Sequence, residues 1–197
     1  MDVSIELIKQ LREMTGAGIV DCKEALKEGE GNVEKAIDVL RRKGIAKASK
    51  KSGRVTTEGL ISSYIHPGGK LGVLVEVNCE TDFVKKTDDF GEFVKDVAMQ
   101  IAASNPLYIK REDVPECVLD KERDILKEQA KSSGKPEKVI ENIVRGRLEK
   151  YFEEICLLEQ PFVKSPDIKV QDLLNNLIAK IGENINIKRF ARFKIGE

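Results

Sequence analysis

The sequence predicts an α+β protein. Apolar residues recur at helical spacing in the first 45 residues, whereas residues 59–65, 71–77 and 185–195 read as strands. Long amphipathic stretches lie together between the second and third strands instead of alternating with single strands. This arrangement is typical of a small antiparallel sheet with helices on one face.

The first 45 residues predict three short helices. Their apolar positions are Leu7, Ile8, Leu11 and Met14, then Ile19, Cys22, Ala25 and Leu26, then Val33, Ala36, Ile37 and Leu40. Asn32 suits the N-cap of the third helix, and Gly44 is expected to end it. Ile19 and Val20 are adjacent and apolar, so either one faces outward or both are core. Three such helices bury only a small core, which is typical of a docking module.

A basic segment follows and separates two predicted domains. Residues 46–57 contain Lys47, Lys50, Lys51 and Arg54. The alternatives are a nucleic-acid contact and a solvated hinge, and the hinge is favoured because no aromatic residue is interleaved with these charges. The predicted division is therefore a helical domain over residues 1–45, a linker over 46–57 and an α+β core over 58–197.

The core is predicted to begin with a β-hairpin covered by a helix. Residues 59–65 and 71–77 flank a turn, and Leu71, Val73, Val75 and Val77 share one face. The covering helix spans residues 88–104 and aligns Phe90, Phe93, Val94, Val97 and Ile101.

The rest of the core is predicted to hold a helical pair and a last strand. The pair spans residues 120–133 and 137–155, with a turn at Ser133-Gly134-Lys135-Pro136 and an antiparallel arrangement. Its apolar positions are Ile125, Leu126, Val139, Ile140, Ile143, Val144, Leu148, Tyr151 and Phe152. An extended segment at 157–163 and a helix at 170–181 follow. The last strand places Ile185, Ile187, Ala191, Phe193 and Ile195 on one face and is expected to pair with the hairpin.

Composition and motifs exclude several function classes. The 34 basic and 34 acidic residues balance, which disfavours a globally basic nucleic-acid binder, and no apolar run is long enough to span a bilayer. Four widely spaced cysteines and a single histidine, His66, disfavour a Cys/His zinc site and predict reduced thiols, as in the cytosol. Phosphate-loop, dinucleotide, nucleophile-elbow and zinc-protease motifs are absent, so no cofactor, metal or catalytic residue is expected.

The most informative segment is Asn78-Cys79-Glu80-Thr81-Asp82-Phe83-Val84, between a strand and a helix. The local pattern alone favours Phe83 as a plug of the local core. The alternative is a side chain presented to a partner, since such connections often carry function. A hydrolase built on Cys79 and Asp82 is a third hypothesis, but Cys79 lacks an obvious base.

Five segments together resemble the bacterial translation elongation factor Ts family. They are Met14 to Gly18 with Asp21-Cys22-Lys23 and Ala25-Leu26, the Thr81-Asp82-Phe83-Val84 motif, Gly134-Lys135-Pro136, Gln160-Pro161-Phe162-Val163, and Ile181 to Ile187. The resemblance covers essentially the whole chain and is to the short type with a single core unit. It implies a first domain similar to ubiquitin-associated domains, and a cytoplasmic protein that is not an enzyme.

The resemblance also implies a function: guanine-nucleotide exchange on elongation factor Tu, which the chain would bind in its GDP-bound and nucleotide-free forms. Phe83 would wedge near the Mg²⁺ site of the partner, with Asp82 fixing the aromatic ring. The implied partner contacts are Asp82, Phe83, Thr81, Val84, Arg12, Ile19, Val20, Ile181 and Gly182. No direct nucleic-acid or membrane binding is implied.

Two questions stay open at this stage. A ubiquitin-associated-type adaptor without exchange activity would explain the first helices but not the core. The unpaired sheet edges, together with the resemblance to the short type, predict a homodimer. The alternative is a monomer in which the helical pair covers the sheet.

Overall fold

The computed structural model describes residues 3–131 and 136–197, and it confirms the α+β class. The chain divides into two compact units, each built from three segments. The first unit holds Met1–Ser62, Glu76–Lys95 and Asp172–Lys188; the second holds Ser63–Val75, Asp96–Gln171 and Arg189–Glu197.

The three predicted N-terminal helices are confirmed. They are α1 (Ile5–Thr15), α2 (Ile19–Glu28) and α3 (Val33–Lys51). Side chains cap two of them, because Ser4 Oγ accepts from the Leu7 N–H at 3.2 Å and Asn32 Oδ1 accepts from the Lys35 N–H at 3.0 Å. Their shared core consists of Leu11, Cys22, Ala25, Leu26, Ala36 and Val39.

The helix end predicted at Gly44 is wrong, because α3 continues to Lys51. Gly44 is buried inside the helix, and a Cβ atom at this position would lie 3.6 Å from the Cβ of Ala179 in α7 (Val170–Ile181). The glycine therefore allows two helices to approach closely rather than stopping one of them. Most of the basic stretch is helical, and only residues 52–57 connect α3 to the sheet.

The sheet has three strands in the order β1 (Glu58–Ile65), β2 (Leu71–Cys79) and β5 (Ile185–Lys194). The predicted hairpin and the predicted pairing of the last strand with it are confirmed. The hairpin closes where the His66 N–H donates to the Leu71 carbonyl, and the Ile195 N–H donates to the Lys70 carbonyl beyond the far end of β5. Both hydrogen bonds fit antiparallel pairing. Val73, Val75 and Val77 are 2% exposed or less, which confirms three of the four residues of the predicted buried face of β2, whereas Leu71 is half buried.

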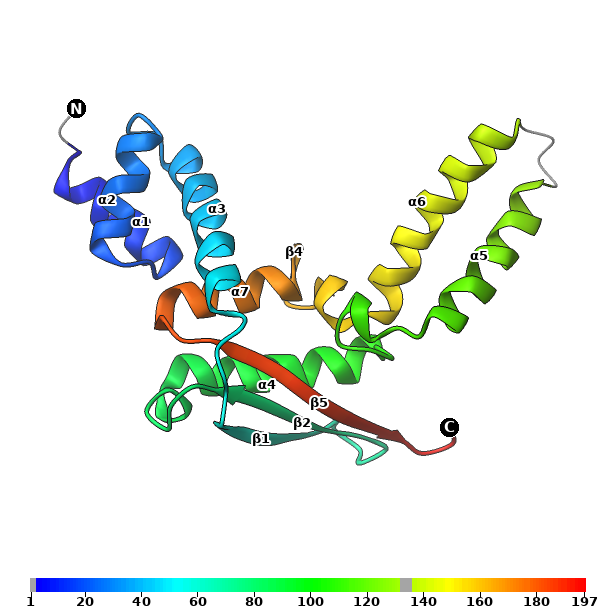
Figure 1. Ribbon diagram of the computed structural model, residues 1–197. Helices are drawn as coiled ribbons and strands as arrows, with labels where there is room; N and C mark the ends of the chain where they lie inside the picture. The colour runs from blue at the N-terminus through cyan, green and yellow to red at the C-terminus, as the bar shows by residue number, and fades with distance from the viewer. Residues whose placement is uncertain (1–2, 132–135) are drawn as a thin grey trace. The chain divides into compact units, whose positions relative to one another are not determined.

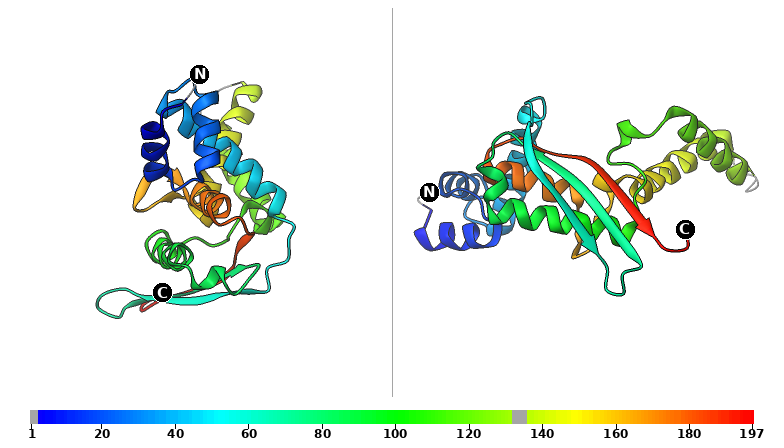
Figure 2. Two further views of the ribbon diagram at one scale, coloured as in Figure 1. Left: turned by 90° about the vertical axis from the view of Figure 1, so that its left-hand side faces the viewer. Right: turned by 90° about the horizontal axis from the view of Figure 1, so that it is seen from below.

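One long helix, α4 (Asp88–Ser104), lies along one face of the sheet (Figures 1 and 2). Its bounds are those predicted. All five of its predicted apolar positions are buried: Phe90, Phe93, Val94, Val97 and Ile101. Period 3.6 in the helix and period 2 in β2 each place one apolar face inward, and these two faces form the core.

The predicted apolar face of the last strand is only half buried. Ile185 and Ile187 are 2% and 3% exposed, whereas Phe193 and Ile195 are 69% and 74% exposed. The apolar face of the strand is therefore covered within this chain only at its N-terminal end. These two side chains are available for a contact outside the chain.

The helical pair consists of α5 (Glu116–Lys131) and α6 (Glu137–Ile155), which run side by side in antiparallel directions (Figures 1 and 2). Leu126, Ala130 and Val144 form the contact between them. The first helix begins four residues earlier than predicted. Ile125 and Val139 are 42% and 41% exposed, so their expected place in the apolar seam is wrong. The predicted turn at Ser133-Gly134-Lys135 lies outside the described residues.

A small second sheet was not predicted. The segment expected to be extended at 157–163 begins with a 3₁₀ turn at Leu157–Glu159, and β3 (Pro161–Phe162) then pairs with β4 (Ser165–Lys169). The helix predicted at 170–181 is confirmed as α7. No helix in the described part of the chain is long and apolar enough to cross a membrane.

Candidate functional site

The connection after β2 presents one large aromatic side chain to solvent. The backbone leaves the sheet after Cys79, passes through residues 80–83, and enters a 3₁₀ turn at Val84–Lys86 before α4. Phe83 is 77% exposed, whereas Val84 beside it is 5% exposed. Val84 therefore anchors the loop in the core, and Phe83 is not the core plug that the local pattern allowed.

Two charged residues hold the exposed ring. Lys86 Nζ lies 2.6 Å from Asp82 Oδ2 and 5.6 Å from the centroid of the Phe83 ring. The hydrogen bond from Lys86 lowers the pKa of the Asp82 carboxyl below its ordinary value. Asp82 is thus paired with the ammonium group that lies over the ring.

Every polar group of Thr81 makes a hydrogen bond. Its N–H and its Oγ1 hydroxyl donate to the two carboxylate oxygens of Glu183, at 3.0 and 2.8 Å. Its carbonyl accepts from the Cys79 thiol at 3.1 Å. Burial raises the pKa of that thiol, and the Glu183 carboxylate raises it further, so the sulfur keeps the proton that it donates.

The turn that carries Glu183 is fastened to the same loop. Gly182 has a φ of 88°, a left-handed conformation that suits glycine at the end of α7. The Asn184 N–H donates to Glu80 Oε1 at 2.6 Å, and its buried side-chain amide donates to the Arg54 carbonyl at 2.8 Å. The structure thus brings the predicted residues Thr81, Asp82 and Phe83 beside half-buried Ile181 and exposed Gly182.

A second exposed apolar group lies at the start of α2. Ile19 and Val20 are 57% and 70% exposed, and Met14 of α1 is 59% exposed. The expectation that Ile19 packs with Cys22, and the alternative that Ile19 and Val20 are both core, are wrong. Arg12 is also exposed.

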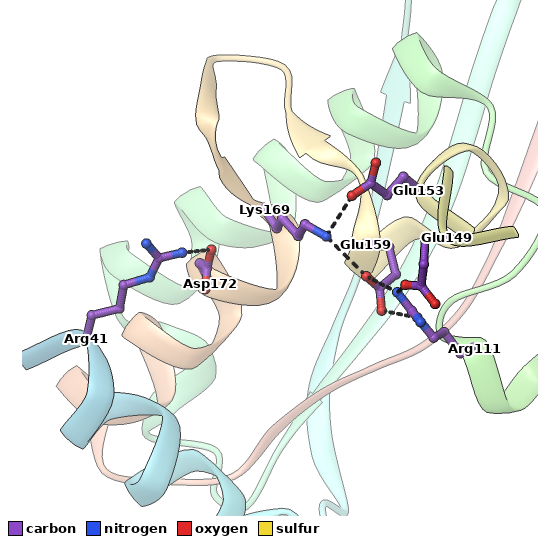
Figure 3. Close-up of polar contacts among 7 residues, drawn as sticks. All are labelled: Arg41, Arg111, Glu149, Glu153, Glu159, Lys169 and Asp172. Atoms are coloured by element: carbon purple, nitrogen blue, oxygen red, sulfur yellow. Dashed lines mark hydrogen bonds and ion pairs between the residues drawn. The ribbon is translucent and has the colours of Figure 1, made fainter. Parts of the chain in front are cut away.

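Helix α7 contacts the three-helix module and α4, and the turn that follows it holds the Phe83 loop. Arg41 Nη2 of α3 lies 2.6 Å from Asp172 Oδ2 at the start of α7 (Figure 3). Lys180 Nζ near its end lies 2.7 Å from Asp89 Oδ1 of α4. A Cβ atom on Gly16, which follows α1, would lie 3.3 Å from Lys180 Cε. These contacts are all inside the first unit, so its exposed groups share one support.

The second unit contains a cluster of ion pairs with no sign of catalysis. Arg111 pairs with Glu159 and with Glu149 at 2.7 Å each, and Lys169 pairs with Glu153 and Glu159 at 3.0 and 3.3 Å (Figure 3). The guanidinium group of Arg111 lowers the pKa of Glu159. Every carboxylate in the cluster has a cationic partner, so the cluster links the C-terminal half of α6 to the small sheet.

The hypothesis of a hydrolase built on Cys79 and Asp82 has no support in the described residues. Within residues 3–131 and 136–197 no group of three or more His, Cys, Asp or Glu side chains is placed to hold a metal ion. The Cys79 side chain is fully buried and protonated, which argues against a nucleophile. His66 is exposed at the hairpin tip, 3.0 Å from the hydroxyl of Tyr64.

Sequence reasoning missed Glu183 as part of the site. Its segment is among those that carry the family resemblance, but the contact between Glu183 and Thr81 joins residues 102 positions apart. No local pattern signals such a contact. The only available sign is a carboxylate directly after the left-handed Gly182.

Comparison with known proteins identifies the family. A family model described as "Elongation factor TS" matches residues 6–197. The chain is 62% identical to elongation factor Ts of Carboxydothermus hydrogenoformans, over 99% of this chain and 90% of that protein. It is 61% identical to elongation factor Ts of Thermoanaerobacter pseudethanolicus, over 99% and 96%, and 60% identical to that of Caldanaerobacter subterraneus subsp. tengcongensis, over 99% and 98%. The chain therefore belongs to the elongation factor Ts family.

Proposed function

We propose that the chain is a guanine-nucleotide exchange factor that accelerates GDP release from elongation factor Tu during translation elongation. The observation that carries the proposal is Phe83, a phenyl ring 77% exposed on a loop fixed by ion pairs and hydrogen bonds. Family membership supports the same role. An exposed aromatic anchor on a rigid support is the kind of group that inserts into a pocket of a partner.

The physical basis of the activity is linkage between two binding events. The chain would bind most tightly when the phosphate and Mg²⁺ site of elongation factor Tu is distorted. Binding of the chain then lowers the partner's affinity for the nucleotide, and bound nucleotide lowers the partner's affinity for the chain by the same ratio. A weakening of about 10⁴-fold requires a coupling of roughly 5.5 kcal/mol. Burying one phenylalanine contributes about 1.5–3 kcal/mol, so other contacts must supply the rest.

The exposed apolar group of the helical module is suited to supply part of that coupling. Arg12, Ile19 and Val20 would dock on the partner, while Phe83 and Asp82 act at the nucleotide site. The elements that carry the two groups are joined to α7 or to the turn after it, so docking of one would help to position the other. Thr81 and Val84 would act mainly by holding the loop, and Ile181 and Gly182 lie close enough to the loop to touch the same partner. The factor would bind elongation factor Tu in its GDP-bound and nucleotide-free forms.

This role needs no cofactor and no covalent step by the chain itself, so the protein would act as a binding partner and not as an enzyme. It would act in the cytoplasm, where translation factors meet the ribosome. The adaptor alternative has less support, because the family match extends over residues 6–197 and not over the helical module alone.

We also propose that the chain forms a homodimer through its sheet. An open groove of about 600 Å³ lies in the second unit, and its lining includes Ile65, Leu74, Phe193 and Ile195. These four side chains are between 48% and 74% exposed. Exposed apolar strand surfaces are usually covered in stable proteins, and a two-fold pairing is the commonest way to cover them.

The direct test is release of a fluorescent GDP from elongation factor Tu, followed with increasing amounts of the chain. The proposal expects acceleration that saturates with concentration. A release rate that does not change at any concentration of the chain would refute the exchange function and leave an adaptor role as the better account.

A further inference from the structure

We propose that Glu183 is a positioning residue for exchange: its carboxylate clamps Thr81 and thereby sets the direction in which Phe83 points. This inference rests on the proposed exchange function. It goes beyond that function by assigning a task to a residue that makes none of the contacts expected with the partner.

The geometry of the clamp is specific. A carboxylate accepts hydrogen bonds at two oxygens, and Glu183 uses one for the Thr81 N–H and the other for the Thr81 hydroxyl, at 3.0 and 2.8 Å. A hydrogen bond to an ionised acceptor is stronger than a neutral one, and this pair is partly buried. Two bonds to a single residue fix both its position and its rotation.

The clamp acts on the loop at the point where it controls the aromatic side chain. Thr81 is two residues before Phe83, and its carbonyl is held by the Cys79 thiol. Val84, one residue after Phe83, is buried. The exposed ring therefore stands on a short segment that is anchored on both sides, and Glu183 provides the anchor on the N-terminal side.

The anchor is itself rigid. Glu183 lies between Gly182, whose left-handed backbone ends α7, and Asn184, whose side chain is 5% exposed. Asn184 donates to Glu80 and to the Arg54 carbonyl, so the turn is fixed from two further directions. A loop held in this way loses less conformational entropy when a partner binds, which is the general advantage of preorganisation.

The experiment combines hydrogen exchange with nucleotide release in the full-length chain. Glu183→Ala should lower amide protection in residues 80–84 by about tenfold or more, while the buried part of α4, residues 93–101, stays protected. Thr81→Val replaces the hydroxyl with a methyl group and should have a smaller effect in the same direction. Asp120→Ala, which removes an exposed ion-paired carboxylate in α5, is the matched control and should change nothing.

The kinetic result must also point to Phe83. Glu183→Ala should lower the maximal release rate about tenfold, with little change in the concentration of the chain that gives the half-maximal rate. In a Phe83→Ala background, Glu183→Ala should lower the rate no further, because the effects of residues that act through one another are not additive. Unchanged loop protection, an unchanged maximal rate, or an effect that adds to that of Phe83→Ala would each overturn the positioning role. If the wild-type chain itself fails to accelerate release, the exchange function is refuted and the positioning role falls with it. If instead the wild type is active and Glu183→Ala is equally active, the positioning role alone is refuted.

Discussion

Replacing Phe83 with alanine separates a functional role of this side chain from a structural one. The ring is 77% exposed, and its described ring contact is Lys86 at 5.6 Å. An exposed cation–π contact contributes about 0.5–1 kcal/mol, so the substitution should cost the fold no more than that. A buried phenylalanine would cost about 3–5 kcal/mol on truncation to alanine.

The expected loss of activity follows from the exposed fraction. Full burial of a phenylalanine contributes about 1.5–3 kcal/mol, and roughly three quarters of the ring is still free to be buried by a partner. The substitution should therefore remove roughly 1.2–2.3 kcal/mol of coupling. This loss corresponds to release of GDP that is about 8- to 50-fold slower at a given concentration of the factor.

The assay is stopped-flow release of fluorescent GDP from elongation factor Tu, paired with a thermal melt of each variant. Leu107→Ala is the matched control, because Leu107 is also a large exposed apolar side chain, 60% exposed, and lies outside the site. Phe83→Ala should slow release while its melting temperature falls by no more than about 2–4 °C, and Leu107→Ala should change neither quantity appreciably.

The opposite pattern would refute the reasoning. A fall in melting temperature of roughly 6–20 °C, the range expected for loss of a core phenylalanine in a chain of this size, would show that the ring supports the fold. Preserved specific activity of the folded fraction would complete the refutation.

Three further predictions address other parts of the account. Removal of residues 1–53 should leave a folded core that binds elongation factor Tu more weakly and melts at a lower temperature, since the Arg41–Asp172 pair and the contact of Gly44 with α7 are lost; unfolding of the remainder, seen by circular dichroism, or unchanged affinity by calorimetry would contradict it. Light scattering should give twice the chain mass of 22.0 kDa at high concentration, and Phe193→Lys should shift the mass toward that of one chain, whereas a single-chain mass at all concentrations would reject the dimer. Because Arg111 and Lys169 depress the folded-state pKa of Glu159, the stabilisation from this carboxylate is complete above its ordinary value of 4.5 and is lost as the pH falls through the depressed pKa. Glu159→Gln should therefore lower the melting temperature at pH 7 and make its decline below pH 4.5 shallower, and parallel melting curves for the two proteins at all pH values would exclude this role.

Elements with one buried face were predictable from the sequence. Helix α4 and strand β2 repeat apolar residues at periods of 3.6 and 2, and every side chain that the periods select is buried except Leu71, which is half buried at the start of β2. The exposed Phe83 was a different case. The local pattern favoured a core plug, which is wrong, and the family resemblance favoured a partner contact.

The errors arose because a local pattern reveals neither distant contacts nor which apolar positions stay uncovered. Glycine is common at the ends of helices, but Gly44 allows α3 to approach Ala179 of α7 closely, and α3 continues beyond it. Ile19 fits the apolar stripe of α2, yet no other element covers it. The clamp between Glu183 and Thr81 joins residues 102 positions apart, which no periodic pattern encodes.

The measurement that tests the central claim most directly is the affinity of the chain for elongation factor Tu, determined by calorimetry with the partner nucleotide-free and with it loaded with GDP. Linkage requires that the ratio of these two affinities equal the ratio of the GDP affinities measured without and with the chain. The account predicts a large ratio, on the order of 10⁴, in favour of the nucleotide-free partner. Equal affinities for the two forms would mean that the chain binds without weakening the nucleotide site, which would contradict exchange activity.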